Sequence, residues 1–551
     1  MKRHERERER ERERRDALND ADSANQIKFA ESTTQSTLQA IILCAGLGTR
    51  LTPITLNKPK PLLEIRGKSI LENTILHLHS ANITDIIVVC GYKAELFAPL
   101  AKKLNFKQVI FPHFATKNSV ASLKFVSDFI TKGTLILNGD LFITQDFTPY
   151  LHFGLSQFLG QEMNQGTFWG YITDENAKLL DIDTNATSGF GDGIAFFDNE
   201  ADLDIIKDSL NKCDDTQYWE SCILGILDKI NFYAFKSPQT FYTEIDSIQD
   251  ALNANLLTPQ EIAIQCASDN KAMRLKGITN INYQINFNGT QKVLRIPSAG
   301  TEKCIDRSVE RRVLELIAPL NLTPKNDFYA NDIKMSDFLS EFRSAEFSDI
   351  NDKFLREVVA QIKKLHAIKY NKNLNIPRIT MQSEIQKYEN LCKFPLTTPK
   401  EHKILLDIAR EMDKSEFVLC HRDLQLPNIM IKDGNLSLAQ PSRELEKNNS
   451  ANAQTIPQKH QRDTAIKFVD FEYAGFSPVA WELGNFSAEL LLDKSQVQNL
   501  AQIYGDISEI EIIKGQLLSN YIWALWSWIY NRIDLGRDYL ARFDKNSRDL
   551  L

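Results

Sequence analysis

The sequence lacks the features that would place it in a membrane or outside the cell. None of its apolar runs approaches the ~18 residues that a membrane-spanning helix needs, and its N-terminal segment has no apolar signal-peptide core. Its eight cysteines occur singly, without the Cys-x-x-Cys or Cys/His spacing of a zinc site. We therefore expect reduced, mostly buried thiols, no membrane insertion and a cytoplasmic location.

The sequence also lacks a strong excess of charge of either sign. With 65 basic and 72 acidic residues, the formal net charge is −7 at pH 7. A mildly acidic chain is not expected to bind nucleic acid. Its 551 residues, 43% of them hydrophobic, are enough for two or more globular domains. Nothing in the sequence predicts an oligomeric state.

Three segments differ from the rest of the chain in composition. Residues 1–37 contain an unbroken alternation from Glu5 to Arg14, and we expect a disordered tail, with a charged interaction tail as the alternative. Residues 434–464 are polar and are expected to form a disordered insertion within a hairpin. Residues 257–272 contain no glycine and are expected to form a helical linker between domains at 38–256 and 273–551.

The first domain alternates expected strands with expected helices. Continuous apolar runs predict strands at residues 38–44, 85–90, 108–111 and 134–137. Helices are expected at residues 70–80 and 119–129. This alternation predicts a doubly wound, Rossmann-like α/β domain.

A glycine loop follows the first expected strand. Glycines at positions 46 and 48 let backbone amides approach a phosphate, and Arg50 supplies a fixed positive fork. The loop is neither a Walker A motif nor a dinucleotide fingerprint. Together with Lys60, held between two prolines, it resembles the signature of sugar-phosphate-type nucleotidyltransferases. The resemblance implies that Lys60 stabilises charge at the attacked α-phosphate and that the loop binds the triphosphate through Ala45, Gly46, Gly48, Thr49 and Arg50.

Two carboxylates are candidates for the metal that this chemistry normally needs. Asp140 follows a predicted strand, at the edge where open α/β sheets bind ligands. The resemblance implies that Asp140 and Asp246 share one Mg²⁺ ion. A turn or helix-capping role is the alternative, and it is strongest for Asp246.

Two short strings narrow the substrate of this domain. Glu244-Ile-Asp-Ser247 and Gln217-Tyr-Trp-Glu220, the latter in an expected helical stretch, resemble bacterial CTP:phosphocholine cytidylyltransferases. A quaternary ammonium group is bound by aromatic faces and often by a carboxylate. We therefore interpret three residues as phosphocholine-binding candidates, with core packing as the alternative: Tyr218, Trp219 and Glu220. Asn118 and Ser122 loosely resemble nucleotide-side positions of the same family.

The second domain contains the spacing of a kinase catalytic loop. The string from His421 to Asn428 reads His-Arg-Asp-x-x-x-x-Asn, and Asp470 follows at the end of an expected strand. In such loops the aspartate, here Asp423, accepts the proton of the attacking hydroxyl. The asparagine and the later aspartate hold Mg²⁺. We therefore predict a protein-kinase-like α+β domain that uses ATP.

The nucleotide side of this domain differs from that of a protein kinase. Expected strands at residues 280–287 and 292–296 are joined at Asn288-Gly289, a strong hairpin signal. An arginine stands where many kinases have lysine, and a glutamate on the following helix can pair with it. The combination resembles choline kinases and their aminoglycoside-phosphotransferase relatives. The nucleotide-binding candidates are Gly277, Thr279, Asn280, Arg295 and Glu310.

The C-terminal part of the chain suggests the acceptor. Trp523 and Trp526 share one helical face, and choline kinases carry a similar pair that encloses the trimethylammonium group. Glu489 is expected to add negative charge nearby. Core packing is the alternative for both tryptophans. Arg422, where asparagine is common, and Lys276, where a second glycine is usual, leave room for a different small amine.

The two resemblances constrain each other, because phosphocholine is the product of one reaction and the acceptor of the other. Together they imply that ATP and choline give phosphocholine, which reacts with CTP to give CDP-choline and pyrophosphate. One alternative is a sugar-1-phosphate nucleotidyltransferase fused to an ethanolamine or aminoglycoside-like kinase. Another is a non-enzymatic scaffold with decayed sites. Channelling and the final acceptor of the activated product stay open.

Overall fold

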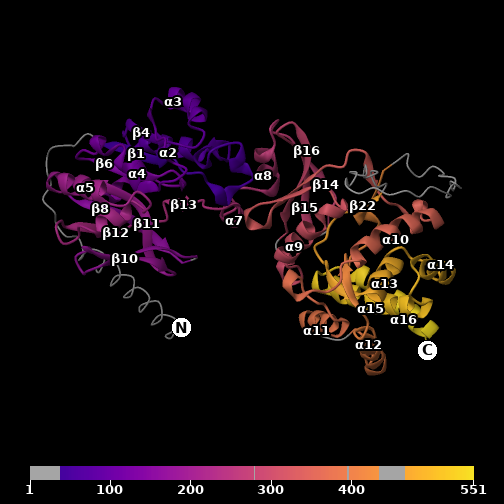
Figure 1. Cartoon of the computed structure of the whole chain (residues 1–551). Coiled ribbons are helices and arrows are strands. Elements are labelled where there is room, and N and C mark those ends of the chain that lie inside the picture. The colour runs from indigo at the N-terminus through magenta and orange to yellow at the C-terminus, as the bar shows by residue number, and fades with distance from the viewer. Residues whose placement is uncertain are drawn as a thin grey trace, which may run out of the picture. The chain divides into compact units, whose positions relative to one another are not determined.

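The computed structural model describes residues 38–550 except 165, 278, 299, 394–395 and 433–465. The expected tail (1–37) and the expected insertion (434–464) therefore lie outside the described residues. The chain divides into two compact units, Met1–Leu257 and Thr258–Leu551 (Figure 1).

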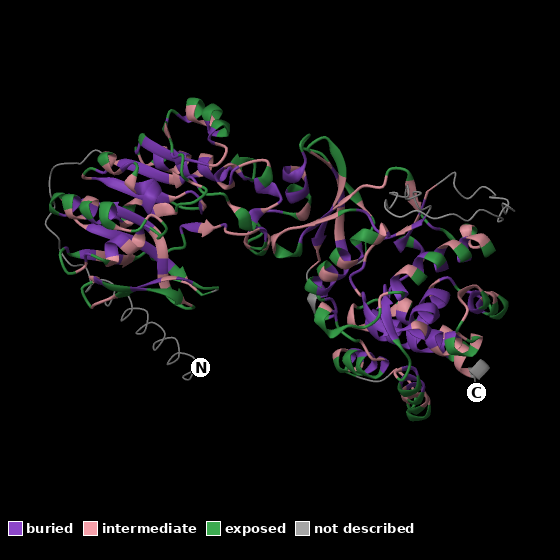
Figure 2. Ribbon diagram, in the orientation of Figure 1, coloured by how far each residue is buried: buried purple, intermediate pink, exposed green. Residues whose placement is uncertain are grey.

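The first unit is built on a mixed sheet of nine strands among the described residues. Its parallel half has the order β6-β1-β4-β5, in which β6, β1 and β4 are largely buried (Figure 2) and β5, at the edge, is half-buried or exposed. Alternate residues of β1 enter different hydrophobic clusters: Ile41 packs on one face, and Ala40 and Ile42 on the other. A strand covered on both faces has to be apolar throughout, which explains the continuous runs. The four strands are β1 (Gln39–Cys44), β4 (Asp85–Cys90), β5 (Lys107–Ile110) and β6 (Thr134–Asn138).

Helices cover both faces of this sheet, which confirms the doubly wound α/β fold. Helix α2 (Ile70–Ser80) packs with one hydrophobic cluster, and α4 (Ser119–Lys124) and α5 (Glu200–Lys212) pack with the other. Helix α4 ends five residues before the expected end, and a 3₁₀ turn at Ser127–Phe129 follows. The other helices of this unit are α3 (Ala98–Leu104), α6 (Glu220–Leu224) and α7 (Ile248–Asn253).

The sequence did not predict the antiparallel strands that extend the sheet. Strand β11 pairs antiparallel with β6, β8 and β9, and β9 pairs antiparallel with β10. Strand β12 pairs parallel with β8 at the other edge. Polar residues interrupt β8 and β10, whereas the short apolar runs of β11 (194–197) and β12 (232–235) were not singled out from the sequence. Their bounds, with those of the short pairs β2–β3 and β7–β13, are β2 (Glu64–Ile65), β3 (Lys68–Ser69), β7 (Leu141–Ile143), β8 (Ser156–Met163), β9 (Phe168–Thr173), β10 (Leu179–Ala186), β11 (Gly189–Phe197), β12 (Phe232–Lys236) and β13 (Tyr242–Glu244).

The second unit begins with helix α8 (Pro259–Cys266), which Thr258 and Glu261 cap reciprocally. A five-stranded antiparallel sheet follows, in the order β14-β15-β16-β18-β17. Asn288 and Gly289 both have positive φ, at 51° and 83°, and join β15 to β16 as the hairpin predicted from this dipeptide. The strands are β14 (Ala272–Leu275), β15 (Asn280–Phe287), β16 (Thr290–Pro297), β17 (Asn326–Phe328) and β18 (Lys334–Asp337).

The rest of the second unit is mainly helical, which confirms the α+β class. Strands β21 and β22, which flank the expected insertion, pair antiparallel. The strands of this part are β19 (Phe342–Ser344), β20 (Phe417–Cys420), β21 (Ile429–Lys432), β22 (Ile466–Phe468) and β23 (Gly475–Pro478). Its helices are α9 (Arg307–Ile317), α10 (Asp352–His366), α11 (Met381–Cys392), α12 (Pro399–Met412), α13 (Val479–Glu489), α14 (Lys494–Tyr504), α15 (Glu509–Ile529) and α16 (Ile533–Leu550).

Helices α13 and α15 approach each other unusually closely. A Cβ atom on Gly484 would lie 2.3 Å from the carbonyl carbon of Gly515, so a larger residue at this crossing would push the helices apart. The contact fixes Glu489, at the end of α13, relative to the tryptophans of α15. Among the described helices, none has both the length and the apolar composition needed to cross a membrane.

Candidate active sites

A cavity of about 500 Å³ opens at the carboxyl ends of β1 and β6 in the first unit. This is the edge at which open α/β sheets bind ligands. All the nucleotide-side candidates of this domain line it: Ala45, Gly46, Gly48, Thr49, Asn118 and Ser122. The cavity also collects Lys60, Arg50, Asp140 and Asp246, although about 100 residues separate the last two in the sequence.

The glycine loop packs directly on the segment that carries the predicted catalytic lysine. Gly48 has a φ of 63°, and a Cβ atom there would lie 3.0 Å from the Cβ of Lys60. Thr55 Oγ1 donates a hydrogen bond to the carbonyl of Gly48 at 2.9 Å. A glycine is therefore required at this position both by its backbone conformation and by the close approach of Lys60.

Lys60 lies between two carboxylates. Its Nζ is 2.9 Å from Asp140 Oδ2 and 2.7 Å from Asp246 Oδ1, and Arg50 also pairs with Asp246 at 2.9 Å. Burial lowers the pKa of Lys60, but the two carboxylates more than offset this and leave that pKa above its ordinary value. Lys60 is therefore a permanent positive charge. Asp246 belongs to the cavity and does not cap a helix.

Three carboxylates form a cluster with the chemistry of a divalent-metal site. Asp140, Glu244 and Asp246 each offer an oxygen within 4.8 Å of the others, and Asp140 Oδ1 is buried without a hydrogen-bond partner. Hard cations such as Mg²⁺ prefer oxygen ligands of this kind. Strand β13 pairs with β7 so that Glu244 lies opposite Leu141, the residue after Asp140. Sequence reasoning missed Glu244 as a ligand because this pairing alone brings it to Asp140.

The three phosphocholine-binding candidates of this domain lie in different environments. Trp219 is 2% exposed and packs against Phe158 and Phe197 in the core, so the core interpretation describes most of its contacts. Tyr218 is 53% exposed, and its ring meets that of Trp169 edge to face at 5.3 Å. Trp169 was missed because it stands in β9 without a motif. Trp219 lines the cavity as well, but Tyr218 and Trp169 form the pair in which the more exposed ring takes part.

Two further carboxylates of the cavity have no cationic partner among the described residues. Burial raises the pKa of Glu220 to about 7 and that of Asp192 to about 6. Glu220 Oε2 is buried without a hydrogen bond, and Asp192 accepts one from the backbone amide of Trp169 at 3.1 Å. Helix α6 begins only at Glu220, so Tyr218 lies in a loop and not in the expected helical stretch. This end of the cavity is acidic and aromatic.

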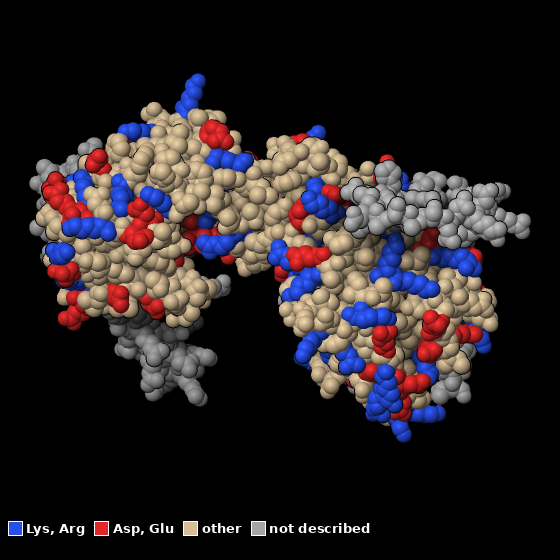
Figure 3. Space-filling view, viewed as in Figure 1, with Lys and Arg blue, Asp and Glu red and all other residues tan. Residues whose placement is uncertain are grey.

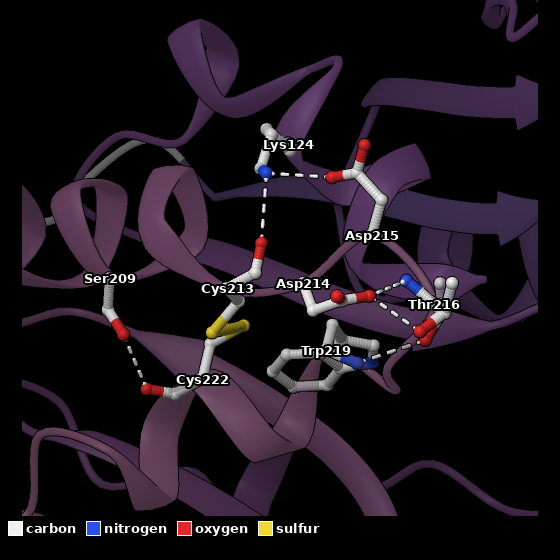
Figure 4. Close-up of a disulfide and its surroundings, with 9 residues drawn as sticks. Lys124, Ser209, Cys213, Asp214, Asp215, Thr216, Trp219 and Cys222 are labelled. Carbon is white, nitrogen blue, oxygen red and sulfur yellow. Dashed lines mark hydrogen bonds and ion pairs between the residues drawn. A yellow bond between two sulfur atoms is a disulfide. The ribbon is translucent and has the colours of Figure 1, made fainter. Parts of the chain in front are cut away.

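A disulfide joins Cys213 to Cys222 at the two ends of the loop that carries Tyr218 (Figure 4). The expectation of eight reduced thiols is therefore wrong for this pair, whereas the six other cysteines form no disulfide and are buried. No short-spacing motif marks a pair nine residues apart, and it forms because the chain returns to the end of α5. In the same loop Asp215 pairs with Lys117 and Lys124, at 2.7 and 2.8 Å.

The predicted catalytic loop of the second unit brings the side chains of Asp423 and Asn428 together. Glu482 of α13 accepts hydrogen bonds from the backbone amides of His421 and Arg422, at 3.0 and 2.8 Å. These bonds support the left-handed backbone of Arg422, whose φ is 69°. Asn428 Nδ2 donates to Asp423 Oδ2 at 3.0 Å. The conformation of this turn thus keeps the side chains of Asp423 and Asn428 in direct contact.

Negative charge is concentrated around this loop. Burial raises the pKa of Asp423 well above its ordinary value, and Glu489 and Asp470 raise it further. Burial and the neighbouring Glu472 raise the pKa of Asp470 to about 7. Asp470 makes no hydrogen bond or ion pair with the residues described. Its oxygens, with the amide oxygen of Asn428, suit a divalent cation.

The nucleotide-side residues of this unit form a buried ionic network. Arg295 pairs with Glu310 at 2.6 Å, as the sequence suggested. Lys334 of β18 pairs with the same carboxylate at 2.6 Å, and sequence reasoning missed it because no motif surrounds it. A Cβ atom on Gly277 would lie 2.6 Å from the carbonyl of Asn280, so this turn needs its glycine.

Thr279 and Asn280 do not present free side chains. Both donate to the buried Glu472, at 2.6 and 2.8 Å. Arg307 pairs with Glu472 at 2.6 Å and also binds Asn280 Oδ1 at 2.9 Å. The side chains thus tie the hairpin to the segment after Asp470, and Glu472 and Arg307 are connections that the sequence did not reveal.

The two tryptophans of α15 form an aromatic cluster beside the catalytic loop. Their rings lie 5.9 Å apart; Trp523 meets Tyr473 edge to face, and Trp526 Nε1 donates to Tyr473 Oη at 2.8 Å. Tyr530 adds a ring 4.8 Å from Trp526. Glu489 accepts a hydrogen bond from Tyr539 at 2.9 Å and is electrostatically coupled to Asp423.

Arg422, a departure from choline kinases, is directed away from the catalytic residues. Its guanidinium pairs with Glu384 at 2.9 Å, donates to the hydroxyl of Ser477 and lies over the ring of Trp481, 5.1 Å from the centroid. All these groups are buried. Arg422 therefore anchors the loop to α11 and β23.

Comparison with known proteins assigns each unit. The model of the nucleotidyl transferase family matches residues 39–176, and that of the choline/ethanolamine kinase family matches residues 273–504. The chain joins these two transferase domains. It is therefore an enzyme with a Rossmann-like nucleotidyltransferase domain and a protein-kinase-like domain, and the alternative of a non-enzymatic scaffold is set aside.

The relatives of the nucleotidyltransferase domain include two bacterial choline-phosphate cytidylyltransferases. The one from Haemophilus influenzae is 28% identical over 225 residues, which are 39% of this chain and 94% of the relative. The one from Streptococcus pneumoniae is 28% identical over 224 residues, or 39% and 95%. For the kinase domain, the crystal structure of the choline kinase LicA from Streptococcus pneumoniae aligns with a TM-score of 0.40 and 19% identity, covering 50% of this chain and 92% of that chain.

Proposed function

We propose that the chain carries out two consecutive steps of CDP-choline synthesis. The kinase domain transfers a phosphoryl group from ATP to choline, and the nucleotidyltransferase domain joins phosphocholine to CMP from CTP with release of pyrophosphate. The observation that carries the proposal is that both sites place aromatic rings and carboxylates without cationic partners beside the reacting groups. A quaternary ammonium ion is bound by this combination, because it offers no hydrogen bond.

In the kinase step, Asp423 accepts the proton of the choline hydroxyl while its oxygen attacks the terminal phosphorus of ATP. The bond from that phosphorus to ADP breaks, and phosphocholine and ADP leave. Trp523 and Trp526 enclose the trimethylammonium group, and Glu489 supplies the opposing charge. Mg²⁺ held by Asn428 and Asp470 would supply positive charge to the phosphate oxygens.

In the nucleotidyl transfer step, a phosphate oxygen of phosphocholine attacks the α-phosphorus of CTP, and pyrophosphate leaves. Lys60 and Arg50 neutralise the charge that develops on the phosphate oxygens. Tyr218 and Trp169 face the cationic head group. Mg²⁺ held by Asp140 and Asp246, with Glu244 as a third oxygen donor, would supply further positive charge.

The proposal is tested by incubating the purified protein with Mg²⁺, ATP, CTP and isotopically labelled choline. Chromatography at successive times should show phosphocholine first and CDP-choline after it. Ethanolamine with ATP, and a panel of sugar 1-phosphates with CTP, are tested in parallel. We expect each of these to react at least tenfold more slowly at equal concentration, because none fills an aromatic site with a quaternary cation.

Three outcomes would contradict the proposal. Faster turnover of ethanolamine would move the kinase assignment to a primary amine. Turnover of a sugar 1-phosphate without turnover of phosphocholine would favour the sugar nucleotidyltransferase alternative. Absence of phosphocholine formation by folded protein that binds ATP would exclude choline as the acceptor.

A further inference from the structure

Two buried cations lie directly opposite each other in the sheet of the kinase domain. Arg295 of β16 and Lys334 of β18 are paired in the register of these antiparallel strands, and they are 4% and 7% exposed. Like charges in directly opposed positions destabilise a sheet. Basic and acidic side chains elsewhere are interspersed on the face of the molecule that Figure 3 shows, where water screens them. The buried pair therefore needs a specific reason.

One carboxylate serves both cations. Glu310, which is fully buried, accepts from Lys334 Nζ at 2.6 Å and from Arg295 Nη1 at 2.6 Å. Burial raises the pKa of Glu310, but the two cations more than offset this and bring that pKa to about 2. Burial and the neighbouring Arg295 lower the pKa of Lys334, although Glu310 opposes this. A single negative charge thus faces two positive charges.

The neighbouring charges do not restore the balance once a metal is bound. Arg307 lies 3.7 Å from Glu310 but is already paired with Glu472 at 2.6 Å. Asp470 is the remaining carboxylate that interacts electrostatically with Arg295 and Lys334. Because Asp470 is a metal ligand in the proposed function, its charge is then engaged elsewhere. Among the described groups, Arg295 and Lys334 then have one carboxylate, Glu310, between them. One positive charge is therefore left to face a ligand.

We propose that Lys334 is a second phosphate-binding side chain of the kinase domain and that Lys334 and Arg295 together hold the phosphate groups of ATP. This inference rests on the proposed kinase function. Arg295 offers a planar fork of donors, whereas Lys334 offers a compact point charge. Phosphate groups between them would supply the missing negative charge, and Glu310 keeps the two cations in position before ATP arrives.

The competing interpretation is that Lys334 only supports Glu310 and never touches ATP. The two interpretations differ in how an effect depends on the number of phosphates in the ligand. Equilibrium binding of ATP, ADP, AMP and adenosine to the full-length protein separates them. The variants are Lys334→Met, which removes the charge, and Lys334→Arg, which keeps it. Lys292→Met is the matched control, because Lys292 pairs with Asp337 across the same two strands.

We expect Lys334→Met to weaken ATP and ADP binding by about 10- to 100-fold, the loss of one charge-assisted hydrogen bond. Adenosine binding should change by less than about twofold, because adenosine carries no phosphate. Lys334→Arg should retain most of the affinity for ATP, and Lys292→Met should match the unchanged protein for all four ligands.

Equal weakening of all four ligands, or no weakening of ATP, by Lys334→Met would overturn the inference. If that variant fails to fold, Lys334→Gln, which removes the charge but keeps a polar group beside Glu310, decides: equal loss for all four ligands, or no loss for ATP, would contradict phosphate binding, and a loss confined to the ligands with phosphates would support it. If choline is not the acceptor, the unchanged protein still binds ATP, and the effect of Lys334→Met still depends on the number of phosphates in the ligand. Failure of the choline assignment is therefore distinguishable from failure of this inference. Absence of ATP binding by the unchanged protein would overturn both.

Discussion

The two sites of this chain differ in how their charge is balanced before any ligand binds. In the nucleotidyltransferase cavity, the cations Lys60 and Arg50 are already paired, and carboxylates such as Glu220 have no cationic partner among the described residues. In the nucleotide part of the kinase site, two buried cations share Glu310. The first site is therefore short of positive charge and the second is short of negative charge.

The difference indicates which ligand each part of the molecule awaits. A surplus of carboxylates beside Tyr218 and Trp169 suits a metal ion and a cationic head group. A surplus of cations beneath the hairpin of the kinase sheet suits phosphates. The acidic half of the kinase site, around Asp423 and Glu489, repeats the pattern of the first cavity. Unbalanced charge in a folded protein is thus a guide to the charge of its ligand.

The largest expected effect comes from removing the proton acceptor of one site only. Asp423→Asn should lower kcat for choline phosphorylation by about a hundred- to ten-thousandfold, because the attacking hydroxyl loses its base. Cytidylyl transfer to supplied phosphocholine, measured in the same preparation, should be unchanged and serves as the folding control. If kinase activity remains within tenfold of the original, Asp423 is not the base.

The converse change tests the other site. Lys60→Met should lower the rate of cytidylyl transfer by about 10²- to 10³-fold, because a fixed charge near the reacting phosphate is lost. Supplied with choline, ATP and CTP, this variant should accumulate phosphocholine. Lys58→Met is the matched control, since Lys58 pairs with the exposed Glu64 at 3.4 Å. Equal loss in both variants would assign the effect to the loop and not to the charge of Lys60.

The sequence predicted those parts of the sites that lie within one short string. The loop around Gly48 and the turn around Asp423 each combine special residues over fewer than about a dozen positions, and their geometry is local. Lys334 and Trp169 were not predicted because strand pairing brings them to their sites. Glu244 stands in the string that contains Asp246, but only the pairing of β13 with β7 shows that it too lies beside Asp140. Pairing between distant strands leaves no local trace in one sequence.

The same reasoning applies to the fold. The parallel strands β1, β4 and β6 could be predicted because burial on both faces makes them largely apolar, whereas polar residues interrupt the antiparallel strands β8 and β10, which carry no such signal. The sequence could not show that Trp219 is buried in the core while its neighbour Tyr218 is exposed. Neighbouring residues in an irregular loop have no periodicity that would indicate which one is buried.

A smaller effect is expected from pH on the acidic end of the first cavity. The pKa of Glu220, which burial raises to about 7, should fall when a cation binds, because the cation favours the carboxylate. Binding then releases a proton, so affinity for phosphocholine should decrease as pH falls below 7. Between pH 8 and pH 6 the KM should rise about tenfold, and kinetics across this range will measure it.

Glu220→Gln is the control for this pH dependence. It should raise the KM for phosphocholine at pH 8 and leave only the pH dependence that the phosphate group of phosphocholine contributes near pH 6, while the KM for CTP keeps its original profile. A pH dependence that persists unchanged in Glu220→Gln would assign the titration to another group, and Asp192, with a pKa near 6, is the next to test.

The smallest effect on activity is expected from the disulfide, which has no counterpart in the kinase domain among the described residues. Alkylation under denaturing conditions should label six of the eight cysteines, and all eight after reduction. Because the bond closes a short loop, the double variant Cys213→Ala/Cys222→Ala should lower the free energy of unfolding of this domain by about 2–3 kcal/mol. Choline phosphorylation should be unaffected.

A reductant distinguishes the bond from the side chains themselves. It should destabilise the unchanged protein by a similar amount to the double substitution and leave the double variant unaltered, because in both cases the loop with Tyr218 loses its covalent closure and keeps its non-covalent contacts, such as the ion pairs of Asp215 with Lys117 and Lys124. Phosphocholine KM should rise in both cases, since an unfastened loop must be ordered on binding. Labelling of all eight cysteines without reduction would instead mean that the pair is a dithiol in solution, the state that a reducing cytoplasm favours.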